Sequence, residues 1–435
     1  MGRRACIVLV VLVACVGCGF FPPGPPVIEG PRLRSVDGGP GYYAGFTPTL
    51  PTSPEYFPVA VWLESVVEPG DVQLDRQMGI NTYAGLTTNS DLGQVEREGS
   101  FALTGWTAPG ASGFMLADEA DMWAGAGSAP WSGMYPGEGE ICDPAPSACG
   151  FTVQESIAET APPGMLVYTN YGKGVTFWES DSDAGRFVNE FQDVVSADNY
   201  WFTDPFICGP SEGGAALNGG QSLPAEECRR AANYGWTIDR MRGLVEPEGS
   251  RPVWALVEVG HPFQEPAGGS IEGPEIRAAV WSSIIHGARG IVYFNHSFGG
   301  DCTTQHVLRG PCGDTVRPWV EGINAQIALL APVLNAPFAD GVAATNQDVD
   351  LATKLHDGAL VVLAASTGDG PQEVTIDLAC SGARTAEVIG EGRSVSVTDG
   401  AIRDVFTDAN AVHLYELVGG DTCGLGDGSR RNQGT

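Results

Sequence analysis

Two glutamates that follow apolar runs are the strongest candidates for chemistry in this sequence. Glu119 stands in "GFMLADEADMW" (113–123), next to Asp118, and Glu258 stands in "PVWALVEVG" (252–260). A pair of carboxyl groups can cleave an acetal when one delivers a proton to the departing oxygen and the other, ionised, stabilises a positively charged carbon. Burial and mutual repulsion raise the pKa of one member of such a pair. A lone glutamate after an apolar run is more often a surface residue or a helix cap, so the prediction depends on the elements that position both.

Short apolar runs recur between residues 57 and 297, and each ends in polar or aromatic residues. Segments typical of helices follow many of them, which is the alternation of parallel βα units. Eight parallel strands, each buried on both faces, favour a closed (β/α)₈ TIM barrel over an open sheet. The eight predicted strands are 57–64, 80–86, 101–106, 113–119, 165–172, 194–201, 252–260 and 290–297.

The connection between the seventh and eighth runs predicts a helix over "GPEIRAAVWSSIIHG". Pro274 suits a first helical turn, apolar residues follow at helical spacing, and Gly287 ends the pattern. The second and third connections are too short for full helices, so we expect the barrel to be irregular there.

After Pro332 the pattern changes to short alternating strands separated by Gly, Asp and Ser turns, which predicts a small antiparallel β-sandwich domain. The expected organisation is a signal peptide over 1–18, a Pro/Gly-rich tether over 19–50, the catalytic barrel over 51–333, the β-sandwich over 334–423 and a flexible tail over 424–435.

Functional groups of such barrels lie at the C-terminal ends of the strands and in the loops that follow. This rule places Glu119 after the fourth strand and Glu258 after the seventh. For Glu64 a structural ion pair is slightly favoured over substrate contact, and for Trp106 barrel packing is favoured over a sugar platform. The predicted substrate contacts are Glu64, Trp106, Asp118, Asn170, Tyr171, Asn199, Tyr200, Trp201 and Asn295.

With glutamates at the ends of strands four and seven, residues 55–300 resemble clan A of the (β/α)₈ glycoside hydrolases, in which a C-terminal β-sandwich is a common companion. In that clan the strand-four glutamate is the general acid/base and the strand-seven glutamate is the nucleophile. The resemblance implies that Glu119 and Glu258 form the catalytic pair of a retaining glycosidase acting on a poly- or oligosaccharide, without a metal or cofactor.

Asp118 departs from the pattern of that clan, because an asparagine that binds a sugar hydroxyl usually precedes the acid/base. The departure motivates two alternatives: a non-catalytic carbohydrate-binding lipoprotein on a barrel scaffold, and a structural surface protein whose β-sandwich binds a partner. Tyr200, near the end of strand six, is expected to hydrogen-bond the nucleophile, as a tyrosine does in related enzymes.

The composition limits which partners the protein can bind and indicates the compartment in which it works. A formal net charge of −30 would repel phosphate backbones and anionic lipid surfaces, so nucleic acid is excluded as a partner. The first 18 residues have a basic start and a short apolar run, which indicates export by a secretory signal. Cys15 or Cys18 would carry the lipid of a membrane-anchored bacterial lipoprotein, and the sequence leaves the oligomeric state open.

Eight further cysteines fall into near neighbours along the chain, which predicts four disulfides outside the cytosol, although eight cysteines allow about 105 pairings. A metal site is the alternative, but the sequence has no spacing typical of one. Several loops that follow the strands also carry aromatic rings, which suit the C–H faces of sugars. The expected pairs are Cys142 with Cys149, Cys208 with Cys228, Cys302 with Cys312, and Cys380 with Cys423.

Overall fold

The computed structural model describes residues 30–264, 269–380 and 382–426, and its central element is a closed barrel of eight parallel strands. Each predicted strand is present, and neighbours in sequence are neighbours in the barrel, with β9 closing onto β2. The predicted fold class is therefore confirmed. The barrel strands are β2 (Val59–Glu64), β3 (Thr82–Leu86), β4 (Phe101–Thr104), β5 (Gly113–Met115), β6 (Val167–Tyr171), β7 (Val194–Ala197), β8 (Val253–Glu258) and β9 (Ile291–Phe294).

The helices that surround the barrel are unequal in length. The first half of the barrel has only short ones, and β4 continues into β5 without a helix, which is the predicted irregularity. The helices are α1 (Asp71–Gln77), α2 (Leu92–Arg97), α3 (Ala120–Trp123), α4 (Gly150–Ala158), α5 (Asp181–Glu190), α6 (Gly213–Leu217), α7 (Ala225–Cys228), α8 (Ala232–Leu244), α9 (Gly273–Ile285) and α10 (Arg317–Asn335), with single turns η1 (Tyr42–Gly45), η2 (Gly174–Trp178) and η3 (Pro311–Gly313).

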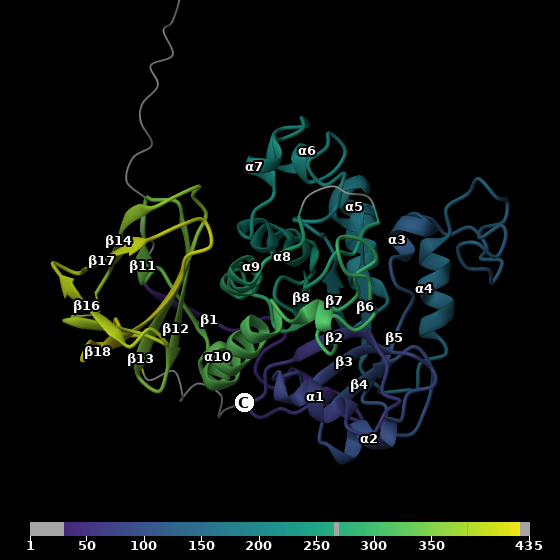
Figure 1. Ribbon diagram of the computed structural model, residues 1–435, viewed down its shortest axis with the longest axis horizontal. Helices are drawn as coiled ribbons and strands as arrows, with labels where there is room; N and C mark the ends of the chain where they lie inside the picture. Colours follow the sequence, from purple (N-terminus) through teal and green to yellow (C-terminus); the bar gives the residue numbers. More distant parts are fainter. Residues whose placement is uncertain (1–29, 265–268, 381, 427–435) are drawn as a thin grey trace, which may run out of the picture.

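Helix α9 forms where the sequence predicted a helix. Pro274 occupies its first turn, and Glu272 and Glu275 form a reciprocal capping box at its start. With α10, it packs between the barrel and a second, β-rich domain (Figure 1).

The second domain consists of antiparallel strands with a hydrophobic core of their own. Ten strands form one hydrogen-bonded series in the order β1-β10-β12-β13-β18-β15-β16-β17-β14-β11. Its C-terminal strands are β10 (Phe338–Asp340), β11 (Ala343–Ala344), β12 (Val349–His356), β13 (Ala359–Ser366), β14 (Gln372–Leu378), β15 (Thr385–Val388), β16 (Arg393–Thr398), β17 (Ala401–Phe406) and β18 (Val412–Val418).

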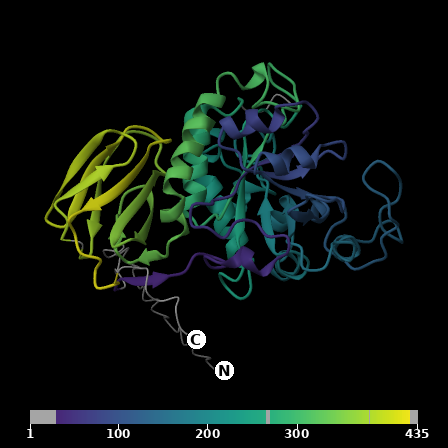
Figure 2. The same ribbon diagram turned by 90° about the horizontal axis from the view of Figure 1, so that it is seen from below.

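The segment from residue 30 to residue 50 is part of the folded body, whereas the sequence assigned it to a tether. Strand β1 (Arg32–Arg34) pairs antiparallel with β10, and Arg34 donates two hydrogen bonds to Asp340. Leu50 is fully buried against the barrel. Figure 2 shows this N-terminal strand, in purple, reaching across to the C-terminal domain.

The predicted signal peptide, the lipidated cysteine and the first part of the tether lie outside the described residues. Within the described ranges, no helix is both long and apolar enough to cross a bilayer.

His286, at the end of α9, joins the two domains through ion pairs. Its Nδ1 lies 2.8 Å from Asp239 of α8 and its Nε2 lies 2.9 Å from Asp350 of β12. Burial alone would lower the pKa of His286, but the two carboxylates outweigh it and raise the pKa to about 9.

We expect the ion pairs of His286 with Asp239 and Asp350 to stabilise the protein at neutral pH and to weaken at alkaline pH. A histidine whose pKa rises from about 6.5 to about 9 on folding stabilises fully below pH 6.5, and the contribution is lost as the pH passes 9. Because Asp239 is half exposed, we expect His286→Asn to cost only about 1–2 kcal/mol at pH 6 and almost nothing at pH 10. Thermal unfolding across this range measures the difference, with His356→Asn, at a partly buried histidine of β12 whose only carboxylate neighbour within 4 Å among the described residues is Asp357 of the same domain, as the control. A cost that is constant with pH would contradict the role of the imidazolium.

Candidate functional site

A cavity of about 450 Å³ opens at the C-terminal ends of the barrel strands, where the sequence placed the site. Its walls combine carboxyl groups, one lysine and several aromatic rings, contributed by the ends of seven strands and the loops after them. The lining residues are Trp62, Leu63, Thr87, Asp118, Glu119, Met122, Lys173, Asp198, Tyr200, Pro262, Phe263, Phe294, His296, Phe298 and Gln305.

Glu119 is held in the cavity by an unusual backbone conformation. It has a φ of 50° and a ψ of 32°, in the left-handed region, and it caps the short helix α3. Its amide donates to the carbonyl of Asn170 at 3.1 Å, which fixes the turn against β6. A non-glycine residue in this region is strained, and such strain persists where the surrounding structure imposes it, often at functional sites.

Gly172 leaves the space that the Glu119 carboxylate occupies. A Cβ atom at this position would lie 2.8 Å from Glu119 Oε1 and would overlap Met122. The chain after β6 therefore passes the carboxylate as bare backbone, a close approach that requires glycine.

Glu119 and Asp198, at the ends of β5 and β7, both line the cavity, close enough for their charges to interact. Burial raises the pKa of both carboxyl groups, and the negative charge of Glu119 raises that of Asp198 further. Both groups therefore hold their protons to a higher pH than free carboxyl groups do.

Asp118 adds a third carboxyl group to the same cavity. Its Oδ1 accepts a hydrogen bond of 3.0 Å from Asn170, whose own oxygen accepts from Ser196 at 2.7 Å. Burial, followed by the neighbouring Glu119, raises the pKa of Asp118 well above its usual value. Asn170 is fully buried and acts as the support that orients Asp118.

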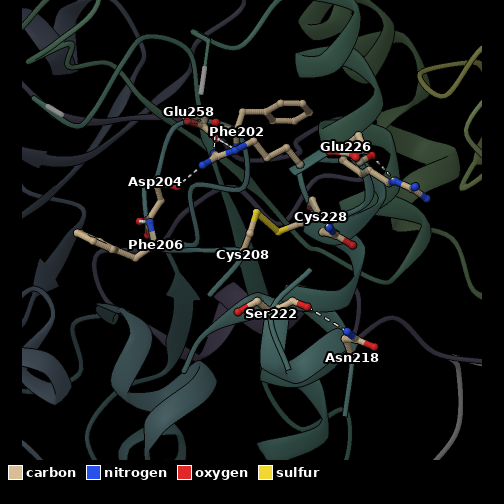
Figure 3. Close-up of a disulfide and its surroundings, with 12 residues drawn as sticks. Phe202, Asp204, Phe206, Cys208, Asn218, Ser222, Glu226, Cys228 and Glu258 are labelled. Carbon is tan, nitrogen blue, oxygen red and sulfur yellow. Dashed lines mark hydrogen bonds between the residues drawn. A yellow bond between two sulfur atoms is a disulfide. The ribbon is translucent and has the colours of Figure 1, made fainter. Parts of the chain in front are cut away.

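Glu258 lies at the end of β8 but is turned away from this cavity. It is fully buried, and it accepts hydrogen bonds from the amide of Phe202 at 2.9 Å, from the hydroxyl of Thr203, and from the hydroxyl of Tyr234 at 2.7 Å. Figure 3 shows Glu258 beside Phe202. Burial raises the pKa of Glu258 to about 7, although the three donors oppose the shift. These contacts anchor the loop to the barrel.

The tyrosine that contacts Glu258 is Tyr234 of α8, whereas the sequence suggested Tyr200. Tyr200 lines the cavity, and its hydroxyl donates to Asp198 at 3.1 Å instead. The sequence could not identify Tyr234, because it lies 34 residues after Tyr200 and only the packing of α8 brings it to the loop that follows β7.

Lys173 is the one lysine or arginine in the cavity lining. Its Nζ lies 2.5 Å from Asp204 Oδ2 and 2.8 Å from Glu212 Oε2. The ammonium also lies 5.8 Å from the ring centre of Phe206 and 5.9 Å from that of Phe263. Its positive charge lowers the pKa of Glu119, against the larger effect of burial.

The structure brings only some of the predicted residues to the cavity. Asp118, Glu119 and Tyr200 line it. The other predicted substrate contacts are absent from the lining. Glu64 and Asn295 are buried in a network of ion pairs and hydrogen bonds with His306 and Arg309, and Trp106 packs against the core. The remaining four are buried and make hydrogen bonds within the protein: Asn170, Tyr171, Asn199 and Trp201.

Asp198 and Lys173 line the cavity but are not among the site residues predicted from the sequence. Asp198 follows β7 directly, so the strand-end rule would have found it. Lys173 follows β6 by only two residues, in "NYGKG", and the same rule reaches it. Of the loop aromatics, Phe263 and Phe298 line the cavity.

All four predicted disulfides are present in the structure. The first three close loops that follow β5, β7 and β9, on the same side of the barrel as the cavity. Cys208–Cys228 holds the loop that carries Asp204 and Phe206, and both lie near this bond in Figure 3.

Removing the Cys208–Cys228 disulfide is expected to reduce stability and to weaken ligand binding in the cavity. A closed loop of 20 residues contributes roughly 3 kcal/mol by limiting the unfolded chain. Replacing both cysteines by serine also frees the loop that holds Asp204 beside Lys173. The Cys380/Cys423 pair, in the β domain, is the matched control, since its loss should lower the melting temperature and leave ligand affinity unchanged. Equal effects of both changes on affinity would contradict a local role of the loop.

Comparisons with known proteins give a distant structural likeness. No family model matches the chain, and no curated protein matches its sequence. A β-galactosidase from Bacillus circulans sp. alkalophilus aligns with a TM-score of 0.49 at 9% identity, over 83% of this chain and 99% of the other. A GH30 endoxylanase from Clostridium papyrosolvens C71 aligns with a TM-score of 0.44 at 10% identity, over 83% and 96%. An Anoxybacillus α-amylase aligns with a TM-score of 0.45 at 9% identity, over 84% and 98%. Likeness at this level carries no argument about function, which depends here on the site itself.

Proposed function

We propose that this protein is a glycoside hydrolase that cleaves O-glycosidic bonds of an oligo- or polysaccharide, with Glu119 as the general acid. The observation that carries the proposal is the pair of buried carboxyl groups Glu119 and Asp198, which line one cavity with several aromatic rings and whose pKa burial raises. Aromatic faces suit the C–H surfaces of sugars, and carboxyl groups suit their hydroxyls. A carboxyl group kept protonated at neutral pH is what acetal cleavage requires.

The proton held by the pair passes to the departing glycosidic oxygen, and the carbon–oxygen bond breaks with its electron pair left on that oxygen. The oxygen of a water molecule then bonds to the anomeric carbon, and a proton of that water returns to the carboxylate. One water is consumed, one new reducing end is formed, and the pair recovers its proton. In the retaining version of this reaction, a carboxylate first forms an ester with the anomeric carbon, and water cleaves the ester.

The carboxyl group proposed to share the proton with Glu119 is Asp198 rather than Glu258. Asp198 lines the same cavity as Glu119, whereas Glu258 is outside the lining and each of its oxygens accepts from buried donors. Reaching a sugar would require Glu258 to leave these donors. The retaining mechanism with Glu119 and Glu258 stays a prediction from the sequence.

The test is to incubate the purified protein with a panel of glycans and to measure new reducing ends. Asp198→Asn and Glu258→Gln are then compared on whichever glycan is cleaved. We expect Asp198→Asn to lose most of the activity and Glu258→Gln to keep most of it.

The opposite pattern, with both variants folded, would contradict the role of Asp198 and support the pair predicted from the sequence. Binding of glycans without release of reducing ends at any pH between 4 and 8 would contradict hydrolysis and favour the non-catalytic carbohydrate-binding alternative.

A further inference from the structure

The charges that surround the cavity are unbalanced. Three carboxyl groups line it, and Lys173 is its one cationic side chain among the described residues. That lysine is already paired with Asp204 and Glu212, two further carboxylates just behind the lining. Its positive charge is therefore balanced by carboxylates of the protein. A ligand carrying a carboxylate or a sulfate would meet no free cation there.

His296 adds no positive charge to this balance. It lines the cavity at 5% exposure, and burial, followed by the neighbouring His306, lowers its pKa. Its ring lies parallel to that of Phe298, with an interplanar angle of 4° and centroids 5.8 Å apart. The neutral imidazole offers one donor and one acceptor.

Two buried side chains of the cavity have polar atoms without a hydrogen-bond partner among the described residues. They are Asp198, whose Oδ1 receives no donor, and His296, of which neither ring nitrogen is paired. Asp198 is 6% exposed, and buried polar atoms of this kind are paired in nearly all native proteins. These atoms therefore indicate a ligand that brings hydrogen-bond donors into the cavity.

The walls already show how an ammonium group is accommodated next to this cavity. The Nζ of Lys173 lies between carboxylates and within about 6 Å of the centres of two aromatic rings, Phe206 and Phe263. Carboxylates and aromatic faces together form the usual environment of a bound amine. The cavity interior repeats this combination, with Asp118, Asp198 and the rings of Phe263 and Phe298.

We propose that the cavity selects a sugar that carries a free amino group, a hexosamine, and rejects sugars that carry a carboxylate or a sulfate. This inference rests on the proposed function for the sugar itself and adds the charge of the substrate. An ammonium group donates three hydrogen bonds, and its positive charge lowers the pKa of the cavity carboxyl groups and so stabilises their ionised form. A uronate is repelled by the same groups.

The experiment measures the binding of a matched series of tetrasaccharides to the full chain by calorimetry. Cellotetraose, its 2-amino, its 2-acetamido and its 6-carboxylate counterparts share one β-1,4 backbone and differ in charge, and methyl galactosides with the same substituents test the other configuration. At 20 mM salt we expect the amine to bind at least tenfold more tightly than the neutral sugar in at least one configuration, and the carboxylate to bind most weakly. At 500 mM salt the advantage should fall severalfold, because salt screens charges.

A variant separates the cavity from the overall charge of the protein. Asp118→Asn should reduce the preference for the amine at least threefold, whereas Asp181→Asn, an exposed carboxylate on α5, should leave the preference intact. Equal binding of amine and neutral sugars, tighter binding of the carboxylate, or no binding of any member at 10 mM would each overturn the inference.

Binding and cleavage are scored separately. If neutral glycans are cleaved and amines show no advantage, charge selection is wrong and the hydrolase proposal stands. If amines bind preferentially and no glycan is cleaved, the hydrolase proposal fails and charge selection stands.

Discussion

Glu119→Gln is expected to lower kcat for glycan hydrolysis by about 10²–10⁴-fold without unfolding the protein. Glutamine keeps the size of the side chain and removes the proton that the leaving oxygen requires. In the wild-type protein the plot of rate against pH should be bell-shaped, because the proposed active form has one of the two carboxyl groups, Glu119 and Asp198, protonated and the other ionised. Since burial raises the pKa of both groups, the alkaline limb should lie above the range of free carboxyl groups.

The measurement is the rate of release of reducing ends between pH 4 and 9, with circular dichroism to check the fold. A substrate with an activated aryl leaving group is the internal control, since a good leaving group needs little protonation and should be cleaved with a smaller loss. Undiminished cleavage of both substrates by the folded variant would remove Glu119 from the mechanism.

Glu258→Leu is expected to destabilise the protein by about 3–5 kcal/mol, whereas Glu258→Gln costs about 1 kcal/mol or less. Leucine leaves the buried amide of Phe202 and the hydroxyls of Thr203 and Tyr234 without an acceptor. Glutamine keeps an oxygen for Phe202 and Tyr234, and its amide can donate to the hydroxyl of Thr203. Urea unfolding followed by tryptophan fluorescence gives the free energies.

The pH dependence supplies a second readout for Glu258. Its pKa rises to about 7 on folding, so the folded protein favours the protonated acid, and the contribution of this group to stability falls as the pH rises through 7. Glutamine does not titrate, and the small cost of Glu258→Gln should therefore shrink as the pH rises from about 4.5 to about 7 and stay constant above pH 7. If leucine and glutamine cost the same, the three donors do not depend on Glu258.

The barrel could be predicted from the sequence because a strand buried on both faces leaves an uninterrupted apolar run, and each of the eight runs became a strand. The same property limits the prediction of the site. Asn170 and Tyr171 are neighbours on β6, yet Asn170 supports Asp118 inside the barrel and Tyr171 donates to the carbonyl of Phe187 on α5. Without an alternating pattern, the sequence does not reveal which of two adjacent residues points inward.

Two other predictions depended on contacts between distant parts of the chain. The orientation of Glu258 follows from donors on the loop after β7 and on α8, which no local pattern connects to β8. The segment from residue 30 has the composition of a linker, and its partner β10 lies about 300 residues away. Composition describes a segment and does not identify what it pairs with.

The pairing of β1 with β10 also constrains the order in which strands can pair while the chain is being synthesised. A growing chain must reach Asp340 before Arg34 finds its partner, so the first ordered strand waits for nearly four-fifths of the sequence. During synthesis the last barrel strand, β9, is made before β10, so β1 stays unpaired until the chain has passed the barrel. Residues 338–418 expressed without residues 32–34 would end the sheet at β10 instead of β1, and β10 would lose the strand that pairs with its outer side.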